Sequence, residues 1–241
     1  MVGAFGTDRS DESTPASRLV NTPNPAGSLG LHQSETIRTA GESLATARAA
    51  MIMVHGRGAT AESILTLVPA FGMDGFAFLA PQAFGNTWYP NSFLAHFSPT
   101  SRDYRRGFRQ IGSVMTVTRA AGISNERIIL PGFSQGACLA IEYSARNPRT
   151  YGGIACLSGG LIGPDGTPRN YPGNLGNTPV FLGCSDVDPH VPAIRVRESA
   201  AIMTEMGASV TLRLYAGMGH LVNDDEIAAV HAMMTKLIGC S

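Results

Sequence analysis

The sequence predicts an α/β fold in which a mostly parallel, twisted sheet carries helices on both faces. Short apolar runs, each long enough for one strand, alternate along the chain with longer segments whose apolar residues recur at helical spacing. This alternation indicates βαβ units, whose strands run parallel. In such sheets the chemistry sits at the carboxyl ends of the strands, so the residues that follow each strand are the first candidates for a site.

The expected elements can be read in order along the chain. The strands are predicted at 49–54, 76–80, 127–131, 153–157, 180–184 and 210–215. The helices are predicted at 61–70, 102–121, 134–146, 192–206 and 224–238. Asn223 can cap the last of these helices, because Glu226 follows three residues later in the pattern of a capping box.

Length and composition favour one globular domain. The chain has 241 residues, enough for a single well-buried core, which we assign to 31–241. Residues 1–30 are rich in Ser, Thr, Asp, Asn, Pro and Gly and lack apolar periodicity, which predicts a flexible leader. The formal net charge is zero and no charge run occurs, so nucleic acid and anionic membranes are not expected as partners.

Targeting, membrane and metal signals are not seen in the sequence. The first residues have neither the basic nor the apolar region of a signal peptide, and no apolar run approaches the ~20 residues of a membrane span. We therefore expect a cytoplasmic protein without stable membrane insertion. The four cysteines form no CxxC pair, and no His, Cys and Asp cluster has metal-ligand spacing, so we expect free thiols, no metal and no cofactor.

The strongest motif is Gly-Phe-Ser-Gln-Gly at 132–136, between a predicted strand and a predicted helix. Such a turn holds a serine with its hydroxyl exposed at the top of the sheet in α/β-hydrolases, and bulkier residues at the flanking glycines would clash. The helix N-terminus adds a positive dipole end beneath the site. Ser134 is therefore the predicted nucleophile; an ordinary glycine turn is the alternative.

A serine nucleophile needs a base, and the base needs an acid to orient it. In this fold the chain order is Ser, then Asp or Glu, then His. His220 follows the last predicted strand in a glycine-flanked loop and is the predicted base. Asp186 and Asp188 both follow the strand at 180–184, and their positions alone do not distinguish them.

Acyl transfer also needs donors for the oxyanion of the tetrahedral intermediate. The backbone N–H of Gln135, directly after the nucleophile, is the first expected donor. The N–H of Arg57 is the second, because Arg57 lies in a glycine-containing segment after the strand at 49–54. The alternative for Arg57 is an ordinary glycine turn.

Four motifs together resemble those of the phospholipase/carboxylesterase family of α/β-hydrolases, which includes acyl-protein thioesterases. They are HGRG at 55–58, GFSQG at 132–136, DPHVP at 188–192 and GMGH at 217–220. The resemblance covers the chain from about residue 49 onward. It implies hydrolysis of carboxylic esters or thioesters, no metal, and an α/β-hydrolase fold with little or no lid. It also implies Asp188 as the acid, because the family's aspartate precedes Pro-x-Val-Pro.

The substrate pocket is expected in the aromatic loop PQAFGNTWYPNSF at 81–93. This loop can wall an acyl site, with Trp88 as the first candidate for contact, although Trp88 could instead pack the loop down. Phe133 and Met218, beside the predicted nucleophile and base, are the other expected substrate-binding residues.

Two departures from the family pattern favour a small-ester hydrolase over a protein thioesterase. Arg57 stands where thioesterase members usually carry an apolar residue, and 182–184 reads Leu-Gly-Cys in place of His-Gly. We therefore predict a carboxylesterase for small-molecule esters with short acyl chains; a homodimer is possible.

Three alternatives compete with this prediction. A lysophospholipase or acyl-protein thioesterase would use the same residues on longer chains. An inactive hydrolase fold would only bind a small molecule, and the intact triad argues against it. A dienelactone-type hydrolase would typically carry Cys at the elbow, where this chain has Ser134.

Overall fold

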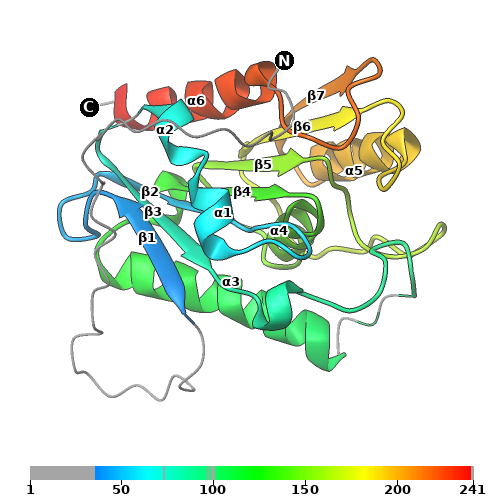
Figure 1. Ribbon diagram of the computed structural model, residues 1–241, viewed down its shortest axis with the longest axis horizontal. Coiled ribbons are helices and arrows are strands. Elements are labelled where there is room, and N and C mark those ends of the chain that lie inside the picture. Colours follow the sequence, from blue (N-terminus) through cyan, green and yellow to red (C-terminus); the bar gives the residue numbers. More distant parts are fainter. Residues whose placement is uncertain (1–35, 73, 97, 99–100, 240–241) are drawn as a thin grey trace, which may run out of the picture.

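Seven strands form one sheet at the centre of the computed structural model, which describes residues 36–72, 74–96, 98 and 101–239. The predicted leader at 1–30 lies outside the described residues. The sheet order is β1-β3-β2-β4-β5-β6-β7 (Figure 1). The strands are β1 (Ile37–Gly41), β2 (Ala49–Ile52), β3 (Phe76–Pro81), β4 (Ile128–Phe133), β5 (Gly153–Leu157), β6 (Pro179–Ser185) and β7 (Ser209–Tyr215). All neighbours are parallel except β1 and β3, so the predicted mostly parallel sheet is confirmed.

Helices cover both faces of this sheet, as predicted (Figure 1). One layer consists of α3 (Arg102–Ala120), α4 (Gln135–Arg146) and α5 (Ala193–Glu205). The other consists of α1 (Ala61–Leu65), α2 (Val68–Phe71) and α6 (Asp224–Gly239). Two single-turn 3₁₀ helices, η1 (Phe84–Asn86) and η2 (Asn125–Arg127), lie in the connections. The architecture is that of an α/β-hydrolase.

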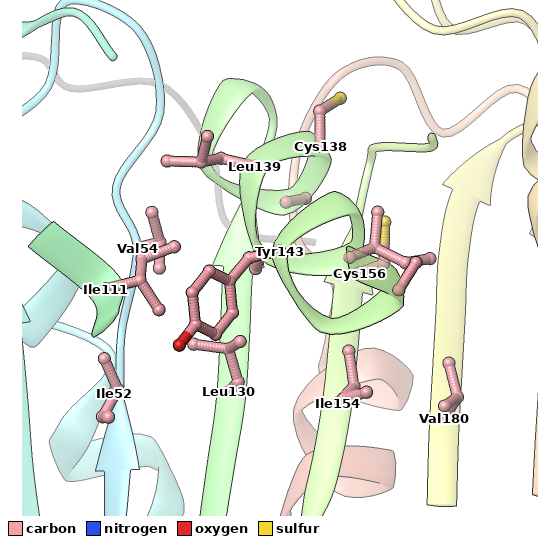
Figure 2. Close-up of a cluster of buried hydrophobic side chains, with 14 of the residues drawn as sticks. Ile52, Val54, Ile111, Leu130, Cys138, Leu139, Tyr143, Ile154, Cys156 and Val180 are labelled. Atoms are coloured by element: carbon pink, nitrogen blue, oxygen red, sulfur yellow. The ribbon is translucent and has the colours of Figure 1, made fainter. Parts of the chain in front are cut away.

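The core divides into two layers because alternate residues of each strand face opposite sides of the sheet. Ala50 and Ile52 of β2 pack towards α3 and α4, whereas Met51 packs on the other side with α1 and α6. Figure 2 shows the first layer, with Leu130 and Ile154 of neighbouring strands lying against α4. Strands buried on both faces explain why the sequence shows continuous apolar runs where these strands lie.

The edge strand β1 is an element that the sequence analysis did not predict. It reads IRTAG, with only partly buried or exposed residues, and pairs antiparallel with β3. A short, half-polar edge strand carries neither a buried apolar run nor clear alternation, so the sequence gives little signal for it.

The single helix predicted at 61–70 is wrong: the segment forms two short helices, α1 and α2. Pro69 explains the break, because a continuous helix would need its missing N–H to donate to Leu65 and its ring would clash with that carbonyl. At the other end of the chain the predicted capping box is confirmed. The Asn223 N–H donates to Glu226 Oε2 at 3.0 Å, and the Glu226 N–H donates to Asn223 Oδ1 at 2.8 Å.

Candidate active site

Ser134 occupies the sharp turn between β4 and α4. Its backbone has φ 55° and ψ −121°, a conformation that L-residues rarely adopt. Two backbone hydrogen bonds hold it there: the Ser134 N–H donates to Leu157 of β5 at 2.9 Å, and the Ser134 carbonyl accepts from Cys138 at 3.0 Å. The strain is therefore fixed by the sheet on one side and by the first turn of α4 on the other.

Two glycines allow this turn to be so tight. A Cβ on Gly132 would lie 2.4 Å from the carbonyl oxygen of Gly136, and a Cβ on Gly136 would lie 2.1 Å from that of Val54. Both contacts are far shorter than real Cβ contacts and involve backbone that cannot move aside. The glycines of the motif are therefore needed to bring the start of α4 against β4 and against the segment that follows β2.

His220 links the serine to a carboxylate. His220 Nε2 lies 2.9 Å from Ser134 Oγ, and His220 Nδ1 lies 2.7 Å from Asp188 Oδ2. The Asp188 side chain is fully buried, whereas 18% of the His220 side chain is exposed. The predicted nucleophile, base and acid thus form one continuous chain of hydrogen bonds, although they lie on three separate loops.

The environment of Asp188 favours its ionised form. Burial alone would raise the pKa of this carboxyl, but hydrogen bonds outweigh burial and hold the pKa below its usual value. His220 supplies one of these bonds, and the N–H groups of His190 and Val191 donate to Asp188 Oδ1 at 2.8 and 3.0 Å. A carboxylate fixed in this way sets the ring orientation of His220 and favours a proton on Nδ1.

Asp186, the other aspartate of this loop, has a different place. Its exposed side chain accepts a hydrogen bond from the Gly217 N–H at 2.8 Å. The neighbouring Ser185 Oγ accepts from the Gly219 N–H at 3.1 Å. The structure therefore brings Asp188 to the His220 ring and uses Asp186 and Ser185 to hold the backbone that carries His220.

The two expected oxyanion donors lie beside the nucleophile. Gln135 is the first residue of α4, and a Cβ on Gly56 would lie 3.5 Å from the Cβ of Ser134, which puts the Arg57 segment against the serine. Among the described residues, no acceptor is hydrogen-bonded to the backbone N–H of Arg57 or Gln135. Both donors are therefore free for a substrate oxygen.

A cavity of about 590 Å³ opens beside Ser134. Its wall includes Gly56, Arg57, Tyr89, Phe93, Phe133, Cys138, His190, Val191 and His220. Of the three expected substrate-binding residues, Phe133 lines this cavity, and its ring centroid lies 5.0 Å from that of His220. Cys138 also faces the cavity, but burial raises the pKa of its thiol to about 12, so it stays protonated.

Trp88 and Met218 do not line this cavity, contrary to the sequence-based expectation. Trp88 is 3% exposed, and its indole N–H donates to the His55 carbonyl at 2.7 Å. A buried indole N–H needs an acceptor, and this one lies in the interior, so the ring braces the loop while the adjacent Tyr89 faces the cavity. Met218 contacts Asn223 instead, with Sδ accepting from Nδ2 at 2.9 Å.

Comparison with known proteins gives the family. The model of the family described as Phospholipase/Carboxylesterase matches residues 39–238. The chain belongs to this family. A crystal structure described as a phospholipase/carboxylesterase from Dyadobacter fermentans DSM 18053 is 42% identical, covers 83% of this chain and 96% of its own, and superposes with a TM-score of 0.79.

Two more distant proteins are also similar to this chain. Acyl-protein thioesterase 1 of Saccharomyces cerevisiae is 35% identical over 118 residues, which are 48% of this chain and 52% of the yeast protein. The matched stretch thus spans about half the length of this curated relative. The Bacillus cereus carboxylesterase structure shares the fold, with a TM-score of 0.63 at 14% identity over 86% of this chain and 96% of its own.

Two residues of this family member support the site in ways that the sequence analysis missed. His55 accepts from the Ala83 N–H through Nε2 at 3.1 Å, so its Nδ1 carries the proton and donates to the Gly56 carbonyl at 2.8 Å. Burial lowers the pKa of His55 and keeps it neutral. The Gln135 side chain bridges the Trp88 N–H and the Tyr89 carbonyl. The position of His55 at the start of the HGRG motif was the signal that could have indicated its role.

The described residues give no sign of a metal centre or of a spanning helix. No group of three or more His, Cys, Asp or Glu side chains in them could hold a metal ion. None of their helices combines the length and the apolar character that crossing a bilayer requires.

Proposed function

We propose that this protein is a carboxylesterase that hydrolyses small esters with short acyl chains. The observation that carries the proposal is the hydrogen-bonded series Asp188, His220 and Ser134 at an open cavity with free N–H donors beside it. This is the arrangement that acyl transfer through a serine requires. Family membership supports an ester or thioester as the substrate.

In the first half of the reaction Ser134 Oγ attacks the ester carbonyl carbon while His220 Nε2 takes the serine proton. Asp188 holds the ring and stabilises the imidazolium that forms. The N–H groups of Gln135 and Arg57 donate to the oxyanion, and each such donor is worth about 3 kcal/mol in the transition state. The C–O bond to the alcohol then breaks, and the leaving alkoxide receives its proton from His220.

In the second half water takes the place of the alcohol. His220 Nε2 removes a proton from water as its oxygen attacks the acyl-enzyme carbonyl, and the same donors hold the second oxyanion. The bond to Ser134 Oγ breaks, the serine regains its proton from His220, and the carboxylic acid leaves. Every proton that moves in this cycle passes through one histidine nitrogen, so no metal or cofactor is required.

The preference for short acyl chains is inferred from the cavity. Its walls include Tyr89, Phe93 and Val191, which can bury a few methylenes. Each buried methylene contributes about 0.8 kcal/mol, but a carbon that extends into solvent contributes little. A cavity of about 590 Å³ shared by the acyl and alcohol parts therefore favours acyl groups of roughly two to six carbons.

A p-nitrophenyl ester series from acetate to palmitate tests the proposal, with Ser134→Ala as the matched variant. We expect kcat/KM to peak between acetate and hexanoate and Ser134→Ala to lower it by several orders of magnitude. Retention of activity within tenfold in Ser134→Ala overturns the mechanism. Absence of hydrolysis by the wild type across the whole series favours an inactive binder.

A thioesterase acting on longer acyl chains is the second candidate, because the curated relatives include acyl-protein thioesterase 1. It makes the opposite prediction in the same series. A maximum at twelve carbons or more, together with faster hydrolysis of the matching thioesters, supports this candidate over the small-ester proposal.

A further inference from the structure

The cavity beside Ser134 is lined by basic groups without any acidic counterpart. Its wall contains Arg57, His190 and His220 but no Asp or Glu among the described residues that line it. The Asp188 carboxylate is fully buried behind His220 and is already engaged by three N–H donors and by the Cys184 thiol. A substrate entering this cavity therefore meets one fixed positive charge and several hydrogen-bond donors.

Arg57 is held in place without being neutralised. Its Nη1 donates to the Pro90 carbonyl at 2.8 Å and its Nη2 donates to the Asn91 carbonyl at 2.5 Å. These acceptors carry no formal charge, and no described carboxylate lies within ion-pair distance of Arg57. A guanidinium has five N–H donors, so hydrogen bonds remain available after these two.

Several other arginines of the chain are neutralised by carboxylates. Arg38 pairs with Glu62, Arg213 pairs with Asp225, and the buried Arg195 pairs with Asp165. Those arginines contribute ion pairs to the structure, whereas Arg57 presents its charge to the cavity. The Arg57 guanidinium carbon lies 6.0 Å from the centre of the Tyr89 ring, and Arg57, Tyr89 and Ser134 line the same cavity, so the charge lies at the wall of the site.

We propose that Arg57 forms an anion subsite and that the preferred substrates are esters carrying a carboxylate or a similar anionic group a few bonds from the ester carbonyl. This inference rests on the proposed ester hydrolysis. Because two carbonyls fix the guanidinium before substrate arrives, little ordering is needed when the anion binds. The exposed His190, in the DPHVP motif, adds a further hydrogen-bond donor. Its ring centroid lies 4.8 Å from that of His220, with the two rings edge to face.

A purely structural role for Arg57 makes a different prediction. The same two hydrogen bonds strap the loop at Pro90 and Asn91 to the HGRG segment. If strapping were the only role, loss of the guanidinium would lower the hydrolysis of charged and neutral esters by the same factor. Only an anion subsite changes the ratio between them.

The experiment compares carboxylates with carboxamides of nearly the same shape. Monoethyl succinate and ethyl succinamate place the group on the acyl side, whereas acetoxyacetate and acetoxyacetamide place it on the alcohol side. Initial rates are followed in a pH-stat at pH 7.5, and kcat/KM for the carboxylate is divided by kcat/KM for the carboxamide. The pair that responds to Arg57 identifies the side on which the anion binds.

Arg57→Gln is the decisive variant and Arg57→Lys its conservative partner. We expect Arg57→Gln to lower the ratio by about tenfold to a hundredfold in at least one pair, the size expected for a hydrogen bond to a charged group. Arg57→Lys should keep most of the preference, because it keeps the charge. Arg105→Gln, an exposed arginine on α3, removes one positive charge elsewhere and should leave both ratios unchanged.

Unchanged ratios in Arg57→Gln for both pairs overturn the anion subsite, even where the carboxamide esters are hydrolysed well. An equal fall in the ratio for Arg105→Gln overturns it too, because the effect would then come from net charge alone. Failure of the proposed function is distinguishable from both results: the wild type then hydrolyses neither member of either pair.

Discussion

Two buried carboxylates close to the His220 loop have opposite electrostatic character. The pKa of Asp188 is held below its usual value, whereas the pKa of Glu226 is raised to about 7. Both side chains are almost completely excluded from water. Burial raises the pKa of both carboxyls, so the opposite net shifts depend on the hydrogen bonds and charges that surround each one.

The number of hydrogen-bond donors accounts for this contrast. Asp188 accepts from the His220 ring and from two backbone N–H groups. Burial is the main cause of the raised Glu226 pKa, and the nearby charge of Asp225 adds to it. Glu226 accepts one bond at Oε2, from the Asn223 N–H, and its Oε1 has no hydrogen-bond partner among the described residues. Three N–H donors thus outweigh the cost of burial at Asp188, and one does not at Glu226.

The two carboxylates also have opposite effects on stability as pH changes. Asp188 stabilises the fold above the usual aspartate pKa and loses that contribution as pH falls. Glu226 keeps its proton in the folded protein after the unfolded chain has released it, so the fold loses stability as pH rises from about 4.5 to about 7. Asp188 is thus ionised beside His220 at neutral pH, whereas Glu226 caps α6 and lowers the stability of the fold as pH rises.

The largest expected effect is on activity and concerns Asp188. Asp188→Asn should lower kcat by roughly 10⁴-fold, because an amide favours the wrong histidine tautomer and cannot stabilise the imidazolium. Asp186→Asn is the matched control, since an amide oxygen can still accept from the Gly217 N–H, and it should stay within about tenfold of the wild type. Steady-state kinetics on a short p-nitrophenyl ester decide the matter, and a larger loss in Asp186→Asn would reverse the assignment of the acid.

The second effect is on stability and concerns Glu226. Glu226→Gln removes a carboxyl whose pKa is raised from 4.5 to about 7, so the variant should gain up to about 3 kcal/mol over the wild type above pH 7. The gain should shrink as pH falls towards and below 4.5, because the unfolded wild-type chain then takes up the proton that the folded chain already holds. Urea unfolding at pH 5 and pH 8 measures both ends. A gain that is the same at the two pH values contradicts the raised pKa.

Most of the fold could be predicted because its signal is periodic. Strands buried on both faces give apolar runs, and the helix α3 repeats Ile111 and Met115 at helical spacing. The edge strand β1 was missed because none of its residues is fully buried and it carries no apolar run. The break between α1 and α2 depends on one proline within an otherwise helical pattern.

The sequence predicted those residues of the candidate site that the order of motifs along the chain identifies. It did not predict those that depend on the direction in which a side chain points. Ser134 and His220 follow from the order of motifs in the fold. The residue patterns alone did not show whether Asp186 or Asp188 is the acid, because the two differ in which carboxylate reaches the His220 ring. Irregular loops have no periodicity, so the sequence could not tell that Trp88 faces the interior and Tyr89 the cavity.

The smallest expected effect is on stability and concerns Asn223, which caps α6 beside Glu226. Asn223 Oδ1 accepts from the Glu226 N–H, and the Asn223 backbone N–H is the one donor to the Glu226 carboxylate in the described chain. Asn223→Ala removes the cap acceptor but keeps that backbone N–H, so we expect a loss of about 1 kcal/mol. Because the carboxylate keeps its donor, the pH dependence of stability should remain that of the wild type.

Asn223→Ser is the matched variant, since serine is also a good cap and should recover most of the loss. Urea unfolding of both variants at pH 5 and pH 8 separates the cap from the buried charge. A loss in Asn223→Ala that grows steeply with pH would mean that the Asn223 side chain, and not its backbone, controls the Glu226 proton. The simple account, in which the number of donors sets the character of each carboxylate, would then fail for Glu226 while standing for Asp188.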